Sequence, residues 1–184
     1  MSILTQTPPT TALPTGTWSV DPAHSTVEFQ VKHMGLVTVR GRAPVLSATI
    51  TGGDEPSIEG TVDATALTTF DETRDGHLRS PDFFDTDRYP ELRFRSTRIA
   101  LENESLVVEG VLTIKGVTKP VVFQGKLLGT GADPWGNDRL GLALAGTIDR
   151  TEFGVIWNAP LPAGGFLLPD DVTIVAELSA VKTA

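Results

Sequence analysis

Apolar residues recur at every second position along most of this chain, which is the side-chain period of a β-strand. In residues 26–33, for example, Val27, Phe29 and Val31 alternate with polar side chains. The same spacing runs clearly through 106–114, 121–127, 140–148 and 172–180, and more weakly through 37–45, 46–51, 57–64 and 91–101. Short turn sequences separate these segments. The pattern predicts about eight to nine strands joined as an antiparallel meander.

Only residues 71–89 interrupt the alternation. Residues 73–79 suit a short helix, and Pro81 is positioned to start a second one. The 18 glycines and 13 prolines argue against a helical bundle, because both residues weaken helix interiors. We therefore expect an all-β domain with a short helical interruption. Alternation alone fits either a sandwich or a closed barrel, since each buries one face of its strands.

Composition excludes several classes of function. The net charge of −8 and the absence of a basic run argue against binding to nucleic acid or to an anionic membrane by charge. The lack of cysteine excludes disulfides, thiolate metal sites and a cysteine nucleophile. No segment approaches the ~18 apolar residues of a membrane-spanning helix, so stable membrane insertion is not expected.

The first residues are rich in threonine and proline, and have neither the basic start nor the apolar run of a secretory signal. We expect residues 1–16 to form a flexible tail, since they have little apolar surface to bury. Residues 17–184 are then a single domain, and the protein is expected to be cytoplasmic.

Three histidines are the most reactive candidates. His24 suits a loop residue bonded to nearby backbone, His33 shares the inward parity of Val27, Phe29 and Val31, and His77 suits a contact between helix and barrel. None lies at a zinc-ligand spacing, and no metal site is predicted.

Other polar and aromatic residues are weaker candidates for a functional role. Arg74 and Asp75 suit either an ion pair at a cavity mouth or a brace for one short helix, the brace being preferred. Trp135 lies in a polar loop and suits either a cover for an opening or, as is often the case for an isolated loop tryptophan, a local plug. No nucleophile–base set is evident, and the sequence predicts neither catalytic residues nor a cofactor.

Several blocks of this sequence, in order from Trp18 to the end, resemble the YceI-like family of polyisoprenoid-binding proteins. Residues 18–29 (WSVDPAHSTVEF) resemble its opening block, followed by His33 and by Val39-Arg40-Gly41. The most specific match is TRDGHLRSPDFFD at 73–85, continued by YPELRFRS at 89–96. Two later blocks, GVLTIKGVTKPV at 110–121 and RTEFG at 150–154, are also similar to the family pattern.

The resemblance implies an extended antiparallel, lipocalin-like β-barrel of about eight strands with a short helical cap. Its lumen would hold a long isoprenoid lipid, such as a polyprenyl lipid or an isoprenoid quinone, without catalysis. Polar candidates for the cavity mouth or its support are His33, Arg74, Asp75 and His77. Apolar candidates for the lumen or cap are Phe29, Val31, Leu78, Phe83, Phe84, Phe94, Phe123 and Phe153. A homodimer is expected because relatives often form one.

Two other functions remain open at this point. The first is an enzyme acting on an isoprenoid lipid, with His33 or His77 as acid or base, since histidine titrates near neutral pH. It requires a histidine that faces the lumen beside a carboxylate. The second is an interaction module whose exposed edge strands pair with a partner.

Overall fold

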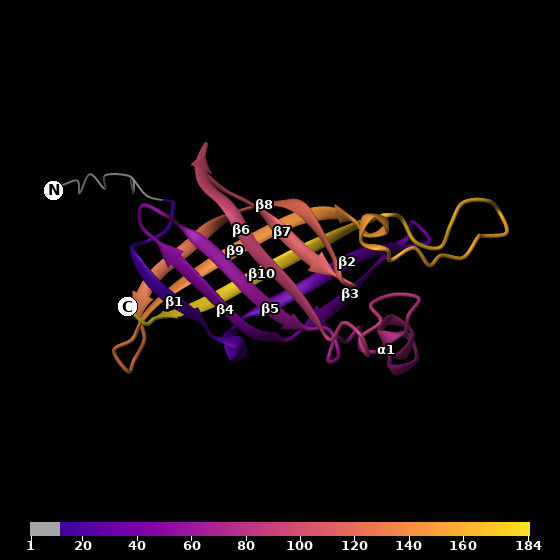
Figure 1. Cartoon of the computed structure of the whole chain (residues 1–184), viewed down its shortest axis with the longest axis horizontal. Coiled ribbons are helices and arrows are strands. Elements are labelled where there is room, and N and C mark those ends of the chain that lie inside the picture. The colour runs from indigo at the N-terminus through magenta and orange to yellow at the C-terminus, as the bar shows by residue number, and fades with distance from the viewer. Residues whose placement is uncertain (1–11) are drawn as a thin grey trace.

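The computed structural model describes residues 12–184, which form one strongly curved antiparallel sheet with little helix (Figure 1). Its strands are β1 (Gly16–Val20), β2 (Thr26–His33), β3 (Val37–Ala43), β4 (Val45–Gly52), β5 (Ser57–Asp63), β6 (Glu91–Glu102), β7 (Ser105–Ile114), β8 (Val117–Ala132), β9 (Asp138–Asp149) and β10 (Asp171–Lys182). Two 3₁₀ turns, η1 (Pro22–His24) and η2 (Arg150–Phe153), and one helix, α1 (Glu72–Arg79), interrupt them. In the part of the chain that is described, no helix has the length and apolar content needed to cross a membrane.

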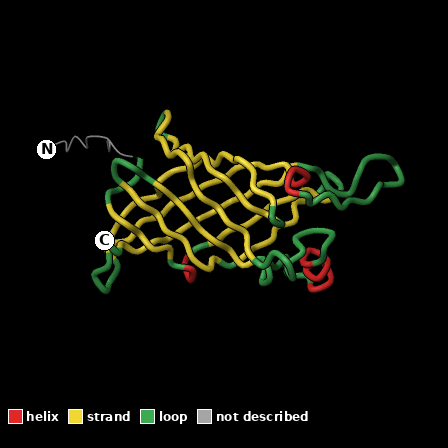
Figure 2. Tube along the Cα trace, in the orientation of Figure 1, coloured by secondary structure: helices red, strands yellow, loops and turns green. Residues whose placement is uncertain are grey.

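The sheet closes on itself because two short strands share one side of β10. Strand β1 pairs with the end of β10, at Ala180–Lys182, and β2 pairs with its beginning, at Thr173–Glu177. Strands β4 and β3 then continue from β1 and β2 in the same way. The ten strands therefore occupy eight positions around a closed barrel (Figure 2). The predicted fold class of an antiparallel β-barrel of about eight strands is confirmed.

The barrel wall is incomplete at one end, which we call the mouth. Pro44 separates β3 from β4, and β5 pairs with β4 but not with β3. The segment between β5 and β6, which contains α1, lies beside this gap (Figure 1). A β-bridge between Arg42 of β3 and Thr68 joins the segment to the wall. The helical cap is thus the element that completes the barrel where the sheet does not.

The cap contains one helix rather than two. Helix α1 begins after Asp71, whose carboxylate accepts a hydrogen bond from the Arg74 amide, and it ends at Ser80. The helix predicted to begin at Pro81 is wrong. Residues 81–84 form hydrogen-bonded turns instead, and Asp85 has a positive φ of 50° that ends any helical path.

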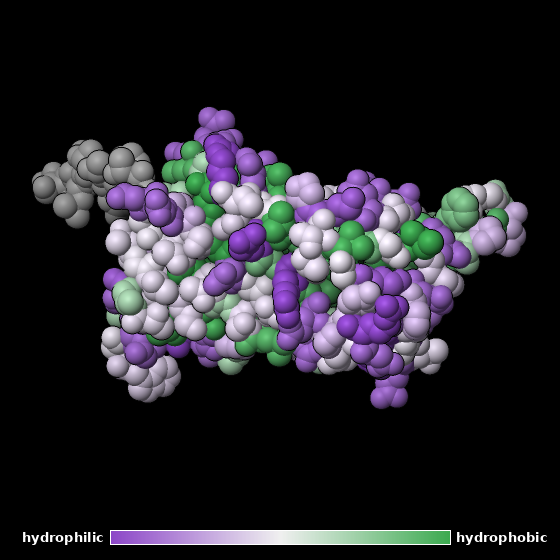
Figure 3. All heavy atoms as spheres, in the orientation of Figure 1, coloured by the Kyte–Doolittle hydropathy of each residue, from purple (hydrophilic) through white to green (hydrophobic). Residues whose placement is uncertain are grey.

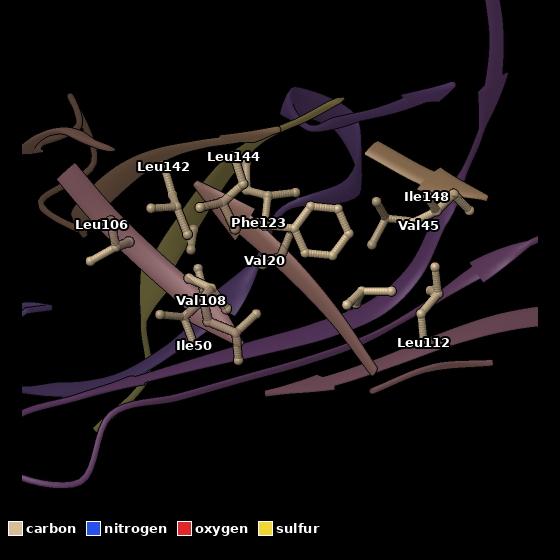
Figure 4. Close-up of a cluster of buried hydrophobic side chains, with 14 of the residues drawn as sticks. Val20, Val45, Ile50, Leu106, Val108, Leu112, Phe123, Leu142, Leu144 and Ile148 are labelled. Carbon is tan, nitrogen blue, oxygen red and sulfur yellow. The ribbon is translucent and has the colours of Figure 1, made fainter. Parts of the chain in front are cut away.

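Buried apolar side chains of β4, β7 and β9 fill the end of the barrel opposite the mouth, the closed end. Ile50, Leu106 and Leu142 come from strands that form the hairpins at this end and are at most 1% exposed (Figure 4). The burial of inward side chains decreases along β10 toward the mouth. Leu178 and Ala180 are buried, whereas Val172 and Ile174, nearer the mouth, are only half-buried. The barrel is therefore packed at one end and hollow at the other.

Part of the predicted tail belongs to this packing. Residues 1–11 lie outside the described residues, but Leu13 is completely buried in the core and Gly16 already belongs to β1. The Leu13 carbonyl also accepts a hydrogen bond from Gly53. The prediction of a flexible segment is therefore wrong for residues 12–16, because a single leucine in a polar sequence closes the end of the barrel.

Candidate functional site

The hollow end of the barrel contains a cavity of about 510 Å³ that opens at the mouth. A second cavity of about 140 Å³ lies deeper. Five side chains line both: Val27, Val62, Leu92, Ile114 and Ile174. The two cavities therefore form successive parts of one elongated space, whose volume lies in the range of small-molecule sites, ~300–1,000 Å³.

The wall of this space is almost entirely apolar. All eight apolar residues predicted for the lumen or cap line it. Phe29, Val31, Leu78, Phe83, Phe84 and Phe153 line the outer cavity, and Phe94 and Phe123 line the deeper one. Such a wall can hold a hydrocarbon chain, whereas a charged group inside it would lose its hydration without compensation.

A glycine on β3 helps to shape the wall. A Cβ atom at Gly41 would lie 2.2 Å from the ring of Phe29, so only glycine lets this ring lie across the neighbouring strand. Phe29 then reaches toward Phe84 of the cap, at a distance of 6.4 Å between ring centroids. The V-x-G block of the sequence thus has a packing role at the cavity.

Three of the four predicted polar candidates line the outer cavity. Arg74 donates from Nε to Thr69 Oγ1 at 2.7 Å and from one terminal nitrogen to the Thr69 carbonyl at 3.0 Å. His33 also faces the cavity, as its parity predicts. Both side chains therefore keep polar atoms available at the mouth.

His77 is held by a carboxylate and two aromatic rings. Its Nε2 lies 2.8 Å from Asp82 Oδ2, and its ring meets Phe83 and Trp157 edge to face at centroid distances of 5.0 and 4.7 Å. His77 was predicted to connect the helix to the barrel, but it contacts Phe83 of the cap and Trp157 of the loop after η2 instead. A histidine, a carboxylate and two aromatic rings meet at the edge of the cavity.

The fourth candidate, Asp75, does not line the cavity. It is buried behind the mouth and does not pair with Arg74. Its carboxylate accepts hydrogen bonds from the Thr68 hydroxyl at 2.8 Å and the Thr69 amide at 2.7 Å. Burial by itself would raise the pKa of Asp75, but the hydrogen bonds from Thr69 and Thr68 outweigh it and hold the pKa below its usual value. Asp75 is therefore a brace between α1 and residues 68–69.

Replacing Asp75 by Asn should lower the free energy of unfolding by about 2–3 kcal/mol at neutral pH, because hydrogen bonds to a buried charged acceptor are lost. A depressed folded-state pKa means that the stabilisation is present above the ordinary value of 3.8 and disappears as the pH falls through the lower folded value. The difference between the wild type and Asp75→Asn should thus be constant above about pH 5 and shrink below about pH 4.

Urea unfolding at a series of pH values measures this difference. Asp138→Asn, at the exposed start of β9, is the matched control and should change stability by less than ~0.5 kcal/mol. A difference for Asp75→Asn that stays constant down to pH 3 would contradict the assignment.

The sequence did not single out Arg150, which organises the loop at the mouth. Its side chain is only 6% exposed, and it donates to the carbonyls of Val155 at 2.7 Å, Trp157 at 2.9 Å and Pro169 at 2.9 Å. Burial lowers the pKa of Arg150, and the nearby carboxylates of Asp170 and Asp149 oppose this shift. Arginine remains protonated in proteins, so a buried cation holds this loop. The RTEFG block was the only sequence signal for it.

Two other residues of interest lie away from the cavity. Trp135 is 81% exposed on the β8–β9 hairpin at the closed end, away from the mouth, so it fits neither of its two predicted roles, the cover for an opening or the local plug. His24 bonds to nearby backbone, since its amide donates to the Asp21 carbonyl at 3.2 Å, and its ring also contacts the Asp21 carboxylate at 2.8 Å. Arg139 and His24 hold the pKa of Asp21 at about 2. Within residues 12–184, no group of three or more His, Cys, Asp or Glu side chains is arranged to hold a metal ion.

Comparison with known proteins places this architecture among related chains. UPF0312 protein plu2095 of Photorhabdus laumondii is 38% identical over 134 residues, covering 71% of this chain and 70% of the relative. Burkholderia cenocepacia BcnA, a solved structure, is 25% identical with a TM-score of 0.70, covering 87% of this chain and 98% of BcnA.

A polyisoprenoid binding domain from Saccharophagus degradans has the same fold, with a TM-score of 0.66 at 16% identity, over 90% of this chain and 98% of that domain. The model of the YceI-like domain matches residues 18–180, which run from Trp18 in β1 to Ala180 in β10. The chain therefore belongs to the YceI-like family.

Proposed function

We propose that this protein binds and carries a long isoprenoid lipid, a polyprenyl lipid or an isoprenoid quinone, without catalysing a reaction on it. The observation that supports the proposal best is the elongated apolar space, closed by packed side chains at one end and open at the other. The name of the Saccharophagus degradans domain and the family resemblance point to the same class of ligand.

The energetics favour a carrier over a tight sensor. Each five-carbon unit moved from water into the lumen gains roughly 3–4 kcal/mol, at ~0.8 kcal/mol per carbon group. An isoprenoid lipid, however, reaches the protein from a bilayer, so its chain moves from one apolar phase to another and most of this gain cancels. Selectivity then comes from the shape of the lumen and from polar contacts at the head group.

Arg74, His33 and His77 are the proposed head-group contacts. They lie at the mouth, so a chain in the lumen leaves its polar end beside them. The N–H groups of Arg74 that Thr69 does not engage can donate to a carbonyl or phosphate oxygen, and His33 can donate or accept. Asp75 supports this arrangement through Thr69 rather than contacting the ligand.

Native mass spectrometry of the gently purified protein tests the proposal. We expect a complex with one lipid per chain, and extracted lipid masses that differ by whole five-carbon units. Denaturing spectra of the same sample are the control and should show the chain alone. A preparation that stays empty after mixing with isoprenoid-containing vesicles would contradict the proposal.

One observation favours a second candidate function. His77 faces the cavity and has a carboxylate partner in Asp82, which is the arrangement required of a histidine acid or base. The same mass spectra separate the two functions. A carrier binds only lipids already present in the supplied vesicles, whether wild type or His77→Ala, whereas an enzyme leaves a product mass on the wild type and only unreacted lipid on the variant.

The expected cytoplasmic location and the homodimer stay predictions. Light scattering on the purified chain measures directly whether it forms a homodimer.

A further inference from the structure

Three segments around the mouth contain no Asp, Glu, Lys or Arg. They are residues 33–39, which run from the end of β2 through the turn into β3, residues 64–70 before α1, and residues 154–169 between η2 and β10. Charged residues make up 21% of the chain, so uncharged segments of this length in loops are a departure from its own composition. We call these three segments together the rim.

Large apolar side chains of the rim face solvent. The six that do so are between 44% and 77% exposed: Met34, Leu36, Val37, Phe70, Ile156 and Phe166. Figure 3 shows green, hydrophobic spheres on the projecting loop at the right, which is the end that carries the mouth. Apolar residues are common singly on a surface, but a group of them at one end marks an interaction site.

The rim is continuous with the cavity. The Met34 amide donates to the Leu167 carbonyl at 2.9 Å, which joins the first segment to the third. Arg42 and Thr68 exchange backbone hydrogen bonds of 2.8 and 2.9 Å, which join the second segment to β3. Each segment also contributes inward side chains to the cavity wall, among them Val39, Leu67 and Leu168. The same loops therefore expose apolar side chains outward and line the cavity inward.

We propose that the rim is a docking surface for a lipid bilayer, through which the isoprenoid ligand enters and leaves. This inference rests on the proposed carrier function. A chain that passes from a bilayer to the cavity across the rim remains among apolar groups, whereas any other route exposes it to water. The absence of charge on the rim avoids the cost of dehydrating charged groups at the membrane surface.

The shape of the rim favours a bilayer over a second copy of the chain. The loop of residues 154–169 projects well beyond the barrel, farther than the β2–β3 turn and the cap (Figure 1). Separate projecting tips can enter a deformable lipid surface individually, whereas a rigid protein partner requires a complementary concave face.

Charges flanking the rim are of both signs, with Lys32 and Arg40 beside its first segment and Asp63 and Asp71 beside its second. Docking should therefore depend on apolar contact and not on anionic lipid. We expect binding to neutral phosphatidylcholine vesicles that changes less than about twofold between low and high salt.

Flotation of the full chain with phosphatidylcholine vesicles tests the proposal. The variant Leu36→Asp/Phe166→Asp should reduce the floating fraction about tenfold or more, because two contacts with the bilayer become charged. The control Leu101→Asp/Trp135→Asp adds the same charge to exposed apolar residues at the closed end and should float like the wild type. If the first variant does not fold, Ile156→Ser/Phe166→Ser replaces it, with folding checked by circular dichroism.

A wild type that does not float, or a rim variant that floats like the control, would overturn the proposal. A dimer in light scattering that becomes a monomer only in the rim variant would also overturn it, by assigning the rim to a second copy. Native mass spectra of the same samples separate the two proposals. Protein that carries lipid but does not float contradicts docking alone, and protein that floats but is empty contradicts the carrier function alone.

Discussion

Replacing Arg150 by Met should lower the melting temperature by about 6–12 °C. We expect a loss of ~3 kcal/mol in the free energy of unfolding, and each kcal/mol corresponds to ~2–4 °C in a chain of this size. The cost arises because the carbonyls of Val155, Trp157 and Pro169 lose the donor that each has in the native state. A carbonyl left without a donor in a buried place costs about 1–3 kcal/mol.

The charge of Arg150 is less important here than its shape. One planar guanidinium reaches three carbonyls from residues on both sides of the projecting loop, and lysine cannot reproduce this set of directions. Arg150→Lys should therefore recover less than half of the loss. The Asn158 side chain also stabilises this loop. Its Nδ2 donates to the Leu168 carbonyl at 2.7 Å, and its Oδ1 accepts from the Leu168 amide at 3.0 Å. Loss of Arg150 should accordingly loosen residues 154–157 more than residues 167–168.

Thermal unfolding followed by circular dichroism measures the first effect, and hydrogen exchange of the loop amides measures the second. Arg93→Ala is the matched control, since Arg93 is an exposed arginine of β6 that pairs with Glu91 at 2.7 Å. Surface ion pairs of this kind contribute ~0–1 kcal/mol. A shift for Arg150→Met as small as that of the control would show that the loop does not depend on this cation.

Local patterns in the sequence predicted the strands well, but not how the barrel closes. The side-chain period of two assigns Val27, Phe29, Val31 and His33 to one face, and the structure directs all four inward. Closure depends on β1 and β2 sharing β10, a pairing of residues more than 140 positions apart that no local pattern encodes. The resemblance to the family, rather than periodicity, distinguished a barrel from a sandwich.

In the candidate site, too, local patterns predicted some features, whereas others depend on residues from distant segments. Apolar lumen residues were predictable because their type and parity suffice to direct them inward. The partners of polar groups were not, because they come from other segments: Asp75 bonds to Thr68 and Thr69, and His77 contacts Trp157. Arg150 was missed because the loop that it holds has neither a strand period nor a helix period.

Replacing Ile174 by Trp should block the passage between the outer and the deeper cavity. Ile174 lines both cavities from β10, opposite Phe29 of β2 and Gly146 of β9. We expect the longest lipid species in native mass spectra to fall at least about tenfold and shorter ones to replace it, because five-carbon units displaced from the deeper cavity would be left in water at the mouth, at a cost of roughly 3–4 kcal/mol each. Total occupancy should change much less, since the outer cavity remains.

The same variant tests whether the lumen is hollow in solution. In a filled core, the larger side chain would be forced into its neighbours at a cost of ~1–3 kcal/mol, whereas an open cavity accepts it with little loss of stability. Val175→Trp places the same residue one position along β10, on the outward face, and should change neither the lipid masses nor the melting temperature appreciably. If Ile174→Trp is strongly destabilised while its lipid masses are unchanged, the space around Ile174 is not where the chain lies. A hollow lumen that holds an isoprenoid requires the opposite pair of results, an unchanged stability and a shorter lipid.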